Sequence, residues 1–168
     1  MLLNNYYAML TAAAMGAGSA QIKDLWDVDY PVKVDLADLD LRPGAVLESA
    51  TGGDGVVFGT GNTTPTMDNF KLSGSYVYST GSNIAYTANG PVETENGLKY
   101  SITYTITNAY DYDLTVGEVG LIRKVYNSNN NGPLYIMVDR TALDTPITIP
   151  IGGVGQVVYT VNLNLPQK

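Results

Sequence analysis

The clearest pattern along the chain is an alternation of apolar and polar residues over 98–108. Large apolar side chains occupy every second position from Leu98 to Ile106, and lysine, serine and threonine fill the positions between them. Because side chains two residues apart lie on the same face of a strand, the pattern predicts a strand with one face in a core and the other in water. The same alternation returns near the end of the chain, from Val157 to Leu165.

Short apolar segments separated by turn residues fill most of the chain after residue 20, and we find no convincing helical period there. We expect strands at 32–36, 45–49, 56–58, 70–79, 84–88, 98–108, 114–126, 134–138, 147–149 and 157–165. The repeated spacing predicts an all-β fold: an antiparallel β-sandwich, jelly-roll or Ig-like, of about nine to ten strands. A parallel βαβ architecture is not expected, because it needs helices between the strands.

Local signals add three expectations about the connections. The loop Thr80-Gly-Ser-Asn83 predicts a hairpin between 70–79 and 84–88. Gly117 and Gly120 would allow a bulge or a close backbone approach within 114–126. Asp144-Thr-Pro146 predicts a turn that leads into the 147–149 strand.

The N-terminal segment differs in character from the rest. We expect residues 1–19 to form a short docking helix and residues 20–168 to form a single β-sandwich domain. Asn4 or Asn5 could cap the helix, and Gly16 and Gly18 could end it. The residues that recur at helical spacing are Tyr6, Tyr7, Leu10 and Ala14. An isolated helix this short is marginal in water, so it must pack on its own sandwich or on a neighbouring subunit. The expected interface residues are Leu3, Tyr6, Tyr7, Leu10 and Trp26.

A secretion signal is the alternative interpretation of this segment. Ala17-Gly-Ser-Ala20 precedes Gln21 and resembles a small-residue cleavage site. However, no lysine or arginine occurs before Lys23, so the positive region that opens a signal peptide is missing. The docking helix is therefore the preferred interpretation.

Composition narrows the chemistry that the chain could perform. The 168 residues carry a net charge of −7, which repels phosphate backbones and makes nucleic acid a poor partner. The absence of cysteine excludes disulfides, and the absence of histidine removes the commonest general base and transition-metal ligand. No apolar run is long enough to span a membrane. We expect neither an enzyme nor a bound cofactor or metal.

Two acidic features still need an explanation. Asp35, Asp38 and Asp40 could offer oxygens to calcium, but their spacing lacks the glycine and closing glutamate of a calcium loop, so a solvated strand end is the preferred interpretation. Glu118 lies inside an apolar strand, where it could face Arg123 or Arg140 in a structural ion pair. A catalytic role for Glu118 is the less favoured alternative.

Aromatic residues suggest contacts with partners or sugars. Trp26 would either anchor an interface or cover the end of the sandwich. Tyr76, Tyr78 and Tyr86 could stack against a sugar, although cross-strand aromatic pairing explains them without a ligand.

Several stretches resemble structural proteins of tailed bacteriophages. One stretch is Val57–Leu72, with its Gly-x-Gly, Thr-Pro-Thr and later Asp-x-x-x-Leu. The others are Tyr104–Asn108, Leu114–Leu121, Asp139–Ile149, the Val157–Leu165 strand and the opening Asn4-Asn-Tyr-Tyr7. The resemblance implies a small β-sandwich virion component that assembles with other virion proteins and with copies of itself, as head decoration, neck, tail or fibre attachment. It brings no catalytic residues.

Two other functions compete with this expectation. A secreted carbohydrate-binding or adhesive sandwich would begin near Gln21 and would use the three tyrosines. A hydrolase would need a pair of carboxyl groups across a cleft, and nothing in the sequence brings a second one to Glu118.

Overall fold

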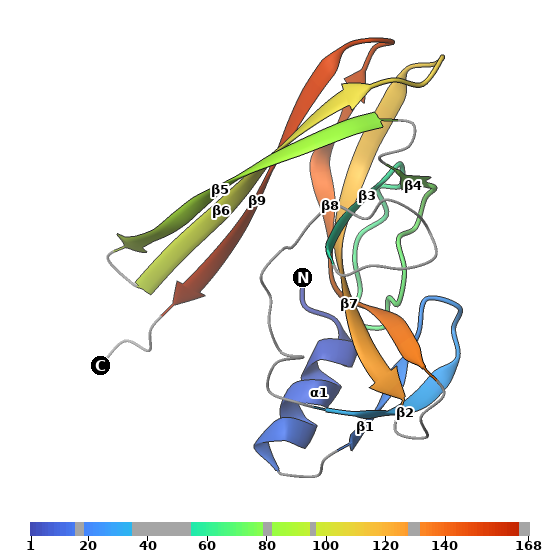
Figure 1. Ribbon diagram of the computed structural model, residues 1–168, viewed down its shortest axis with the longest axis vertical. Helices are drawn as coiled ribbons and strands as arrows, with labels where there is room; N and C mark the ends of the chain where they lie inside the picture. The colour runs from blue at the N-terminus through green and yellow to red at the C-terminus, as the bar shows by residue number, and fades with distance from the viewer. Residues whose placement is uncertain (16–18, 35–54, 79–81, 95–96, 128–131, 165–168) are drawn as a thin grey trace. The chain divides into compact units, whose positions relative to one another are not determined.

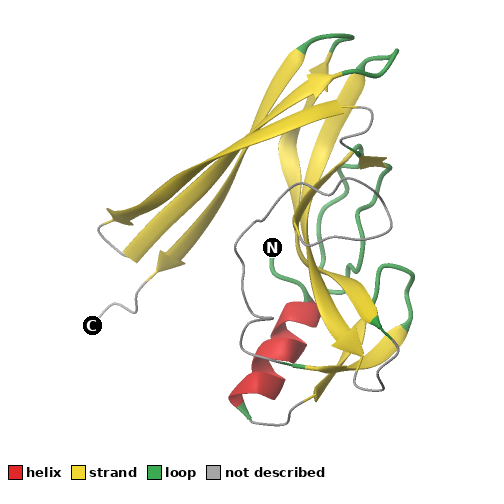
Figure 2. Ribbon diagram, viewed as in Figure 1, coloured by secondary structure: helices red, strands yellow, loops and turns green. Residues whose placement is uncertain are grey.

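The protein is described by a computed structural model that covers residues 1–15, 19–34, 55–78, 82–94, 97–127 and 132–164 (Figure 1). Helix α1 (Asn4–Ala14) is followed by β1 (Ser19–Lys23), β2 (Asp29–Lys33), β3 (Gly55–Gly59), β4 (Tyr76–Val77), β5 (Ser82–Thr94), β6 (Gly97–Asn108), β7 (Leu114–Asn127), β8 (Pro133–Ile149) and β9 (Val154–Asn164). The strands form two antiparallel sheets (Figure 2). The predicted all-β class with a short N-terminal helix is therefore confirmed.

The chain divides into two compact units. Unit 1 comprises residues 1–80 and 115–147, and unit 2 comprises residues 81–114 and 148–168. The sheet of unit 1 has the strand order β1-β2-β7-β3-β4, with β8 also paired to β7. The sheet of unit 2 has the order β5-β6-β9. Helix α1 belongs to unit 1, so the N-terminal segment packs on its own chain.

Unit 2 follows the alternation of its sequence closely. β6 is the central strand and pairs with β5 on one side and β9 on the other, with Tyr104 opposite both Tyr86 and Val157. Ile102, Tyr104 and Ile106 are buried, as the pattern predicts. The pattern fails only at the start of the strand, where Leu98 is 42% exposed.

The predicted hairpin between 70–79 and 84–88 is wrong. β4 pairs with β3, and β5 pairs with β6 through a long ladder that reaches from Ser82 opposite Asn108 to Thr94 opposite Gly97. The register explains the outcome, because it places Ile84 opposite Ile106, Tyr86 opposite Tyr104 and Ala88 opposite Ile102 on one face of the ladder. Most of the 60–75 segment is a connection whose backbone is held by side chains, not by a strand partner.

Other strand predictions also need correction. The segments 134–138 and 147–149 belong to one continuous strand, β8, so Asp144-Thr-Pro146 is not a turn. Proline is compatible with a strand where its missing N–H is not needed for pairing. The strand predicted at 32–36 is β2, which ends at Lys33. The strand predicted at 45–49 lies outside the described residues.

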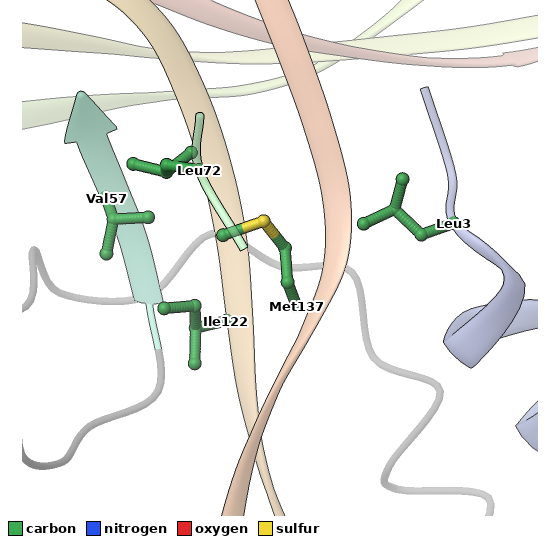
Figure 3. Packing of buried hydrophobic residues seen from close by; sticks show 5 residues of the cluster. All are labelled: Leu3, Val57, Leu72, Ile122 and Met137. Carbon is green, nitrogen blue, oxygen red and sulfur yellow. The ribbon is translucent and has the colours of Figure 1, made fainter. Parts of the chain in front are cut away.

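The core of unit 1 joins segments that are far apart in the sequence. Val57 from β3, Ile122 from β7 and Met137 from β8 are almost fully buried together with Leu72 and Leu3 (Figure 3). Leu3 reaches this cluster from the segment just before α1. There the backbone N–H of Leu3 donates to the carbonyl of Val138 on β8. The N-terminal segment is thus anchored both by a buried side chain and by its backbone.

Helix α1 buries a different face from the one that the sequence predicts. Its buried residues are Asn5, Met9 and Ala12, whereas Tyr7 and Leu10 are about two-fifths exposed, at 42% and 41%. The asparagines do not cap the helix either: the N-cap residue is Leu3, with no side-chain cap. Asn5 points into the unit because its amide binds strand backbone, a contact that no local pattern reveals. The helix ends at Ala14, before the predicted stop at glycines 16 and 18, which lie outside the described residues.

Candidate functional site

A buried ion pair lies at the centre of unit 1. Glu118 lies on β7 and Arg140 on β8, and their side chains are 0% and 1% exposed. The Arg140 Nε–H donates to Glu118 Oε2 at 2.8 Å. The predicted structural pairing of Glu118 with Arg140, one of two arginines considered, is therefore confirmed.

The Glu118 carboxylate holds the connection between β3 and β4. Its Oε1 accepts a hydrogen bond from the backbone N–H of Gly74 at 2.7 Å, and its Oε2 accepts one from the backbone N–H of Ser73 at 3.1 Å. The Ser73 hydroxyl lies 3.2 Å from Oε1. With the bond from Arg140, both carboxylate oxygens are occupied by donors of the protein itself.

The Arg140 guanidinium holds another part of the same connection. Nη1 donates to Asn69 Oδ1 at 2.6 Å, and Nη2 donates to the carbonyl oxygen and hydroxyl of Thr63, at 3.0 and 2.9 Å. Asn69 in turn accepts a bond from the backbone N–H of Thr66. The pair and its polar partners Thr63, Asn69, Ser73 and Gly74 are called the clamp below.

Glycines line the clamp because there is no room for side chains. A β-carbon on Gly61 would lie 2.0 Å from the Ser73 hydroxyl oxygen and 2.4 Å from Glu118 Oε1. A β-carbon on Gly117 would lie 2.3 Å from the carbonyl oxygen of Gly61. The close backbone approach predicted at Gly117 is thus confirmed, and it is the condition for bringing β7 against the connection.

Electrostatics keep Glu118 ionised in spite of its burial. Desolvation alone would raise the pKa of this carboxyl, but the hydrogen bonds from Ser73 and Gly74, together with the charge and hydrogen bond of Arg140, lower it below the ordinary value. A carboxylate that is held ionised and fully hydrogen-bonded is a poor general acid or base. The geometry favours a structural role.

The clamp brings together three segments that are far apart in the sequence. Glu118 comes from Leu114–Leu121, Arg140 from Asp139–Ile149, and Thr63 and Asn69 from Val57–Leu72. The N-terminal segment joins at the same place, since the backbone N–H of Arg140 donates to the carbonyl of Met1. Sequence reasoning identified Glu118 and Arg140. It missed Asn69, Ser73 and Gly74, which carry only the ordinary signature of a turn.

The aromatic candidates are divided between the two units. The rings of Tyr76 and Tyr78 stack in unit 1 with centroids 5.9 Å apart. Burial raises the pKa of Tyr76 to about 12. Tyr86 lies in unit 2 and faces Tyr104 across the β5–β6 ladder, with centroids 6.2 Å apart. The cross-strand explanation is therefore confirmed for Tyr86, and the hairpin that was to unite the three tyrosines does not exist.

The predicted interface residues lie in different environments. Trp26 is 62% exposed in the loop between β1 and β2, so it does not cover the end of a sheet. Tyr7 and Leu10 are partly exposed on α1, and the ring of Tyr6 meets that of Tyr7 edge-on. Leu3 is fully buried in its own unit, so its side chain does not belong to an outer surface.

The remaining candidates concern metals and membranes. Asp35, Asp38 and Asp40 lie outside the described residues. In the part of the chain that the structure does describe, no group of three or more acidic side chains could hold a metal ion. No helix of that part is long and apolar enough to cross a bilayer. Comparison of the chain with protein-family models, curated proteins and solved structures found no match.

Proposed function

We propose that this chain is a multi-copy structural component of a tailed-phage particle and acts by protein–protein assembly. The supporting observation is the clamp: stretches that resemble phage structural proteins meet in one buried network. Glu118 and Arg140 bind each other and hold the connection between β3 and β4 through Ser73, Gly74 and Asn69. Buried polar networks of this kind hold one arrangement of the backbone. They therefore suit a rigid building block better than a reaction centre.

Exposed apolar side chains on the same unit suit contacts with other subunits. Tyr7 and Leu10 on α1 and Met15 at its C-cap are all substantially exposed, and so is Trp26. Aromatic and methionine side chains are enriched at protein interfaces, and weak contacts multiply with copy number. The proposal covers head decoration, neck, tail or fibre attachment. It includes no enzymatic activity, and neither nucleic acid nor a membrane is a partner.

Binding to particles tests the proposal. We expect the full chain to sediment with phage particles that lack it, and to appear in complete particles at many copies by quantitative mass spectrometry. Deleting residues 1–16 is a poor test, because it removes Leu3, Asn5 and Met9 from the core. Leu10→Ser changes an exposed position and should weaken binding to particles, whereas Tyr112→Ser, on the exposed turn before β7, serves as the control.

One set of results would contradict the proposal. In that set, the chain is absent from purified particles and stays monomeric, and the Leu10→Ser variant binds particles no more weakly than the wild type. The carbohydrate-binding alternative predicts in that case that Tyr86→Ala abolishes retention on a sugar matrix. The hairpin on which that alternative rested is not formed, because β4 pairs with β3 and β5 pairs with β6.

A further inference from the structure

Strand β1 is the outer strand of the unit 1 sheet, and among the described strands only β2 pairs with it. In an antiparallel pair, the backbone groups of successive residues point alternately toward the partner and away from it. The backbone N–H of Asp24 donates to the carbonyl of Val28, which places residue 24 in a hydrogen-bonded pair. Counting back along the register, Ile22 and Ala20 also point toward β2. Lys23, Gln21 and Ser19 therefore point their backbone groups toward the open edge.

Two further observations agree with this assignment. Gln21 lies opposite Pro31, which has no N–H to donate. The backbone of Lys23 is bound from the open side by the amide of Asn5: the Lys23 N–H donates to Asn5 Oδ1 at 2.9 Å, and Asn5 Nδ2 donates to the Lys23 carbonyl at 2.7 Å. The side chain of Asn5 thus makes the two hydrogen bonds that a residue of a neighbouring strand would make. The outward groups of Ser19 and Gln21 continue the same edge, and no described residue takes the place of a strand partner there.

A shallow groove lies along this part of the edge. It has a volume of about 550 Å³, and its lining includes Ala8, Thr11 and Ala12 of α1 and Ser19, Ala20 and Gln21 of β1. The small side chains of Ala8 and Ala12 leave room beside the strand, and the larger Tyr7 and Met15 also line the groove. A helix that flanks an open strand edge is a geometry in which proteins accept an extended peptide as an additional strand.

Charge defines the kind of segment that fits. The groove shares Asn4, Ala8 and Gln21 with a neighbouring hollow that contains Asp29 and Asp68. The one lysine of that hollow, Lys23, is paired with Asp27, so its charge is already balanced. The chain as a whole carries a charge of −7. A partner segment with lysine or arginine at the end that passes Gln21 would be complementary to this hollow.

We propose that the edge of β1 beside α1 is a docking site for an extended, positively charged segment of another polypeptide, which adds to the sheet as a strand at Ser19 and Gln21. The inference does not depend on the chain being a phage protein, because it follows from the hydrogen-bond directions of β1, the groove and the charges. A negative result in the particle-binding test would not contradict this docking site. A negative result in the peptide-binding test would not contradict the proposed function.

The test uses the full chain and a synthetic probe, the peptide Lys-Lys-Val-Thr-Val-Thr-Val-Thr. The decisive variant is Gln21→Pro, which removes the outward N–H but no hydrogen bond to β2. Gln21→Thr is the matched control, since it changes the side chain and keeps the N–H. We expect the peptide to bind wild type and Gln21→Thr alike, and Gln21→Pro at least about tenfold more weakly, a difference of about 1.4 kcal/mol. Replacing the two lysines of the probe by glutamates should weaken binding at least as much.

Hydrogen exchange provides an independent readout. The peptide should slow exchange of the Ser19 and Gln21 amides and leave those of Ala20 and Ile22, which already point toward β2, unchanged. If Gln21→Pro fails to fold, Ser19→Pro takes its place, because it removes the other outward N–H. Equal binding to wild type and the proline variant would overturn the proposal, as would no binding at millimolar peptide. Self-association of the chain that Gln21→Pro abolishes would show that a second copy, and not a basic segment, occupies the edge.

Discussion

The two units satisfy their buried polar residues in different ways. In unit 2, the buried amide of Asn108 donates to the carbonyls of Tyr112 and Ile149 and accepts a bond from the N–H of Tyr110, all close to the turns at one end of its sheet. In unit 1, the two most deeply buried polar residues, Glu118 and Arg140, are charged, and Arg140 reaches Thr63, which is 77 residues away. The polar contact in unit 2 is a single neutral side chain, whereas unit 1 depends on an ion pair whose further hydrogen bonds reach residues 69 and 63, 71 and 77 positions from Arg140.

This difference implies that the units respond differently to substitution. Removing one member of a buried ion pair leaves an uncompensated charge, which costs more than removing a neutral hydrogen bond. A regular ladder such as β5-β6-β9 distributes its stabilisation over many pairs, each worth a fraction of a kcal/mol. We therefore expect the large effects in unit 1 and the small ones in unit 2.

Arg140→Met should give the largest effect. It leaves the Glu118 carboxylate buried without its cation and should lower the free energy of unfolding by about 3–5 kcal/mol. The matched substitution in unit 2 is Lys99→Met, at an exposed position of β6, and it should change the free energy by about 0.5 kcal/mol or less. Urea unfolding followed by tryptophan fluorescence and circular dichroism measures both. Equal losses at the two positions would contradict the contrast between the units.

Substitutions at two glycines should distinguish the cost of a steric clash, at Gly61, from the cost of a left-handed backbone conformation, at Gly152. Alanine at Gly61 would place its β-carbon against Ser73 and Glu118, which should cost about 1–3 kcal/mol, and Gly61→Asn should be worse. Gly152 in unit 2 has φ of +68° and open space around it, so Gly152→Ala should cost about 1–2 kcal/mol. Gly152→Asn should recover much of that loss, because asparagine tolerates this conformation. Thermal unfolding of the four variants measures these differences.

The acid stability of the protein should depend on Glu118. Its pKa is lowered in the folded state, so near the ordinary value of 4.5 the unfolded chain binds more protons than the folded one. The stabilisation is complete above that value and is lost as the pH falls through the lower, folded pKa. We expect Glu118→Gln to be less stable than wild type at pH 7, with the difference shrinking on acidification below about pH 4. A constant difference across this pH range would mean that the carboxylate is not held ionised.

The smallest effect should come from the aromatic pair of unit 2. Tyr86 is 52% exposed and lies opposite Tyr104, so Tyr86→Ala should cost about 0.5–1.5 kcal/mol. Thr87→Ala, on the opposite face of the same strand, is the control and should cost less. If the tyrosine variant lost as much stability as Arg140→Met, unit 2 would depend on single contacts as strongly as unit 1 does.

The same contrast explains how much could be predicted from the sequence. β6, β7 and β9 were predicted well, because the alternation that indicates a strand depends only on residues close together in the sequence. The partner of β5 was not, because register depends on the strand across the ladder. Glu118 was recognised as a buried ion-pair candidate since a lone charge inside an apolar strand needs a counter-charge. Asn5 was assigned to capping because nothing local indicates that its amide would bind β1.

The central structural claim is that Glu118 and Arg140 act as one unit that joins distant segments. A double-mutant cycle with Glu118→Gln and Arg140→Met, measured by urea unfolding, tests it most directly. The account predicts that the double variant loses less stability than the sum of the single losses, with a coupling energy of about 2 kcal/mol or more. Losses that add to within about 0.5 kcal/mol would contradict it.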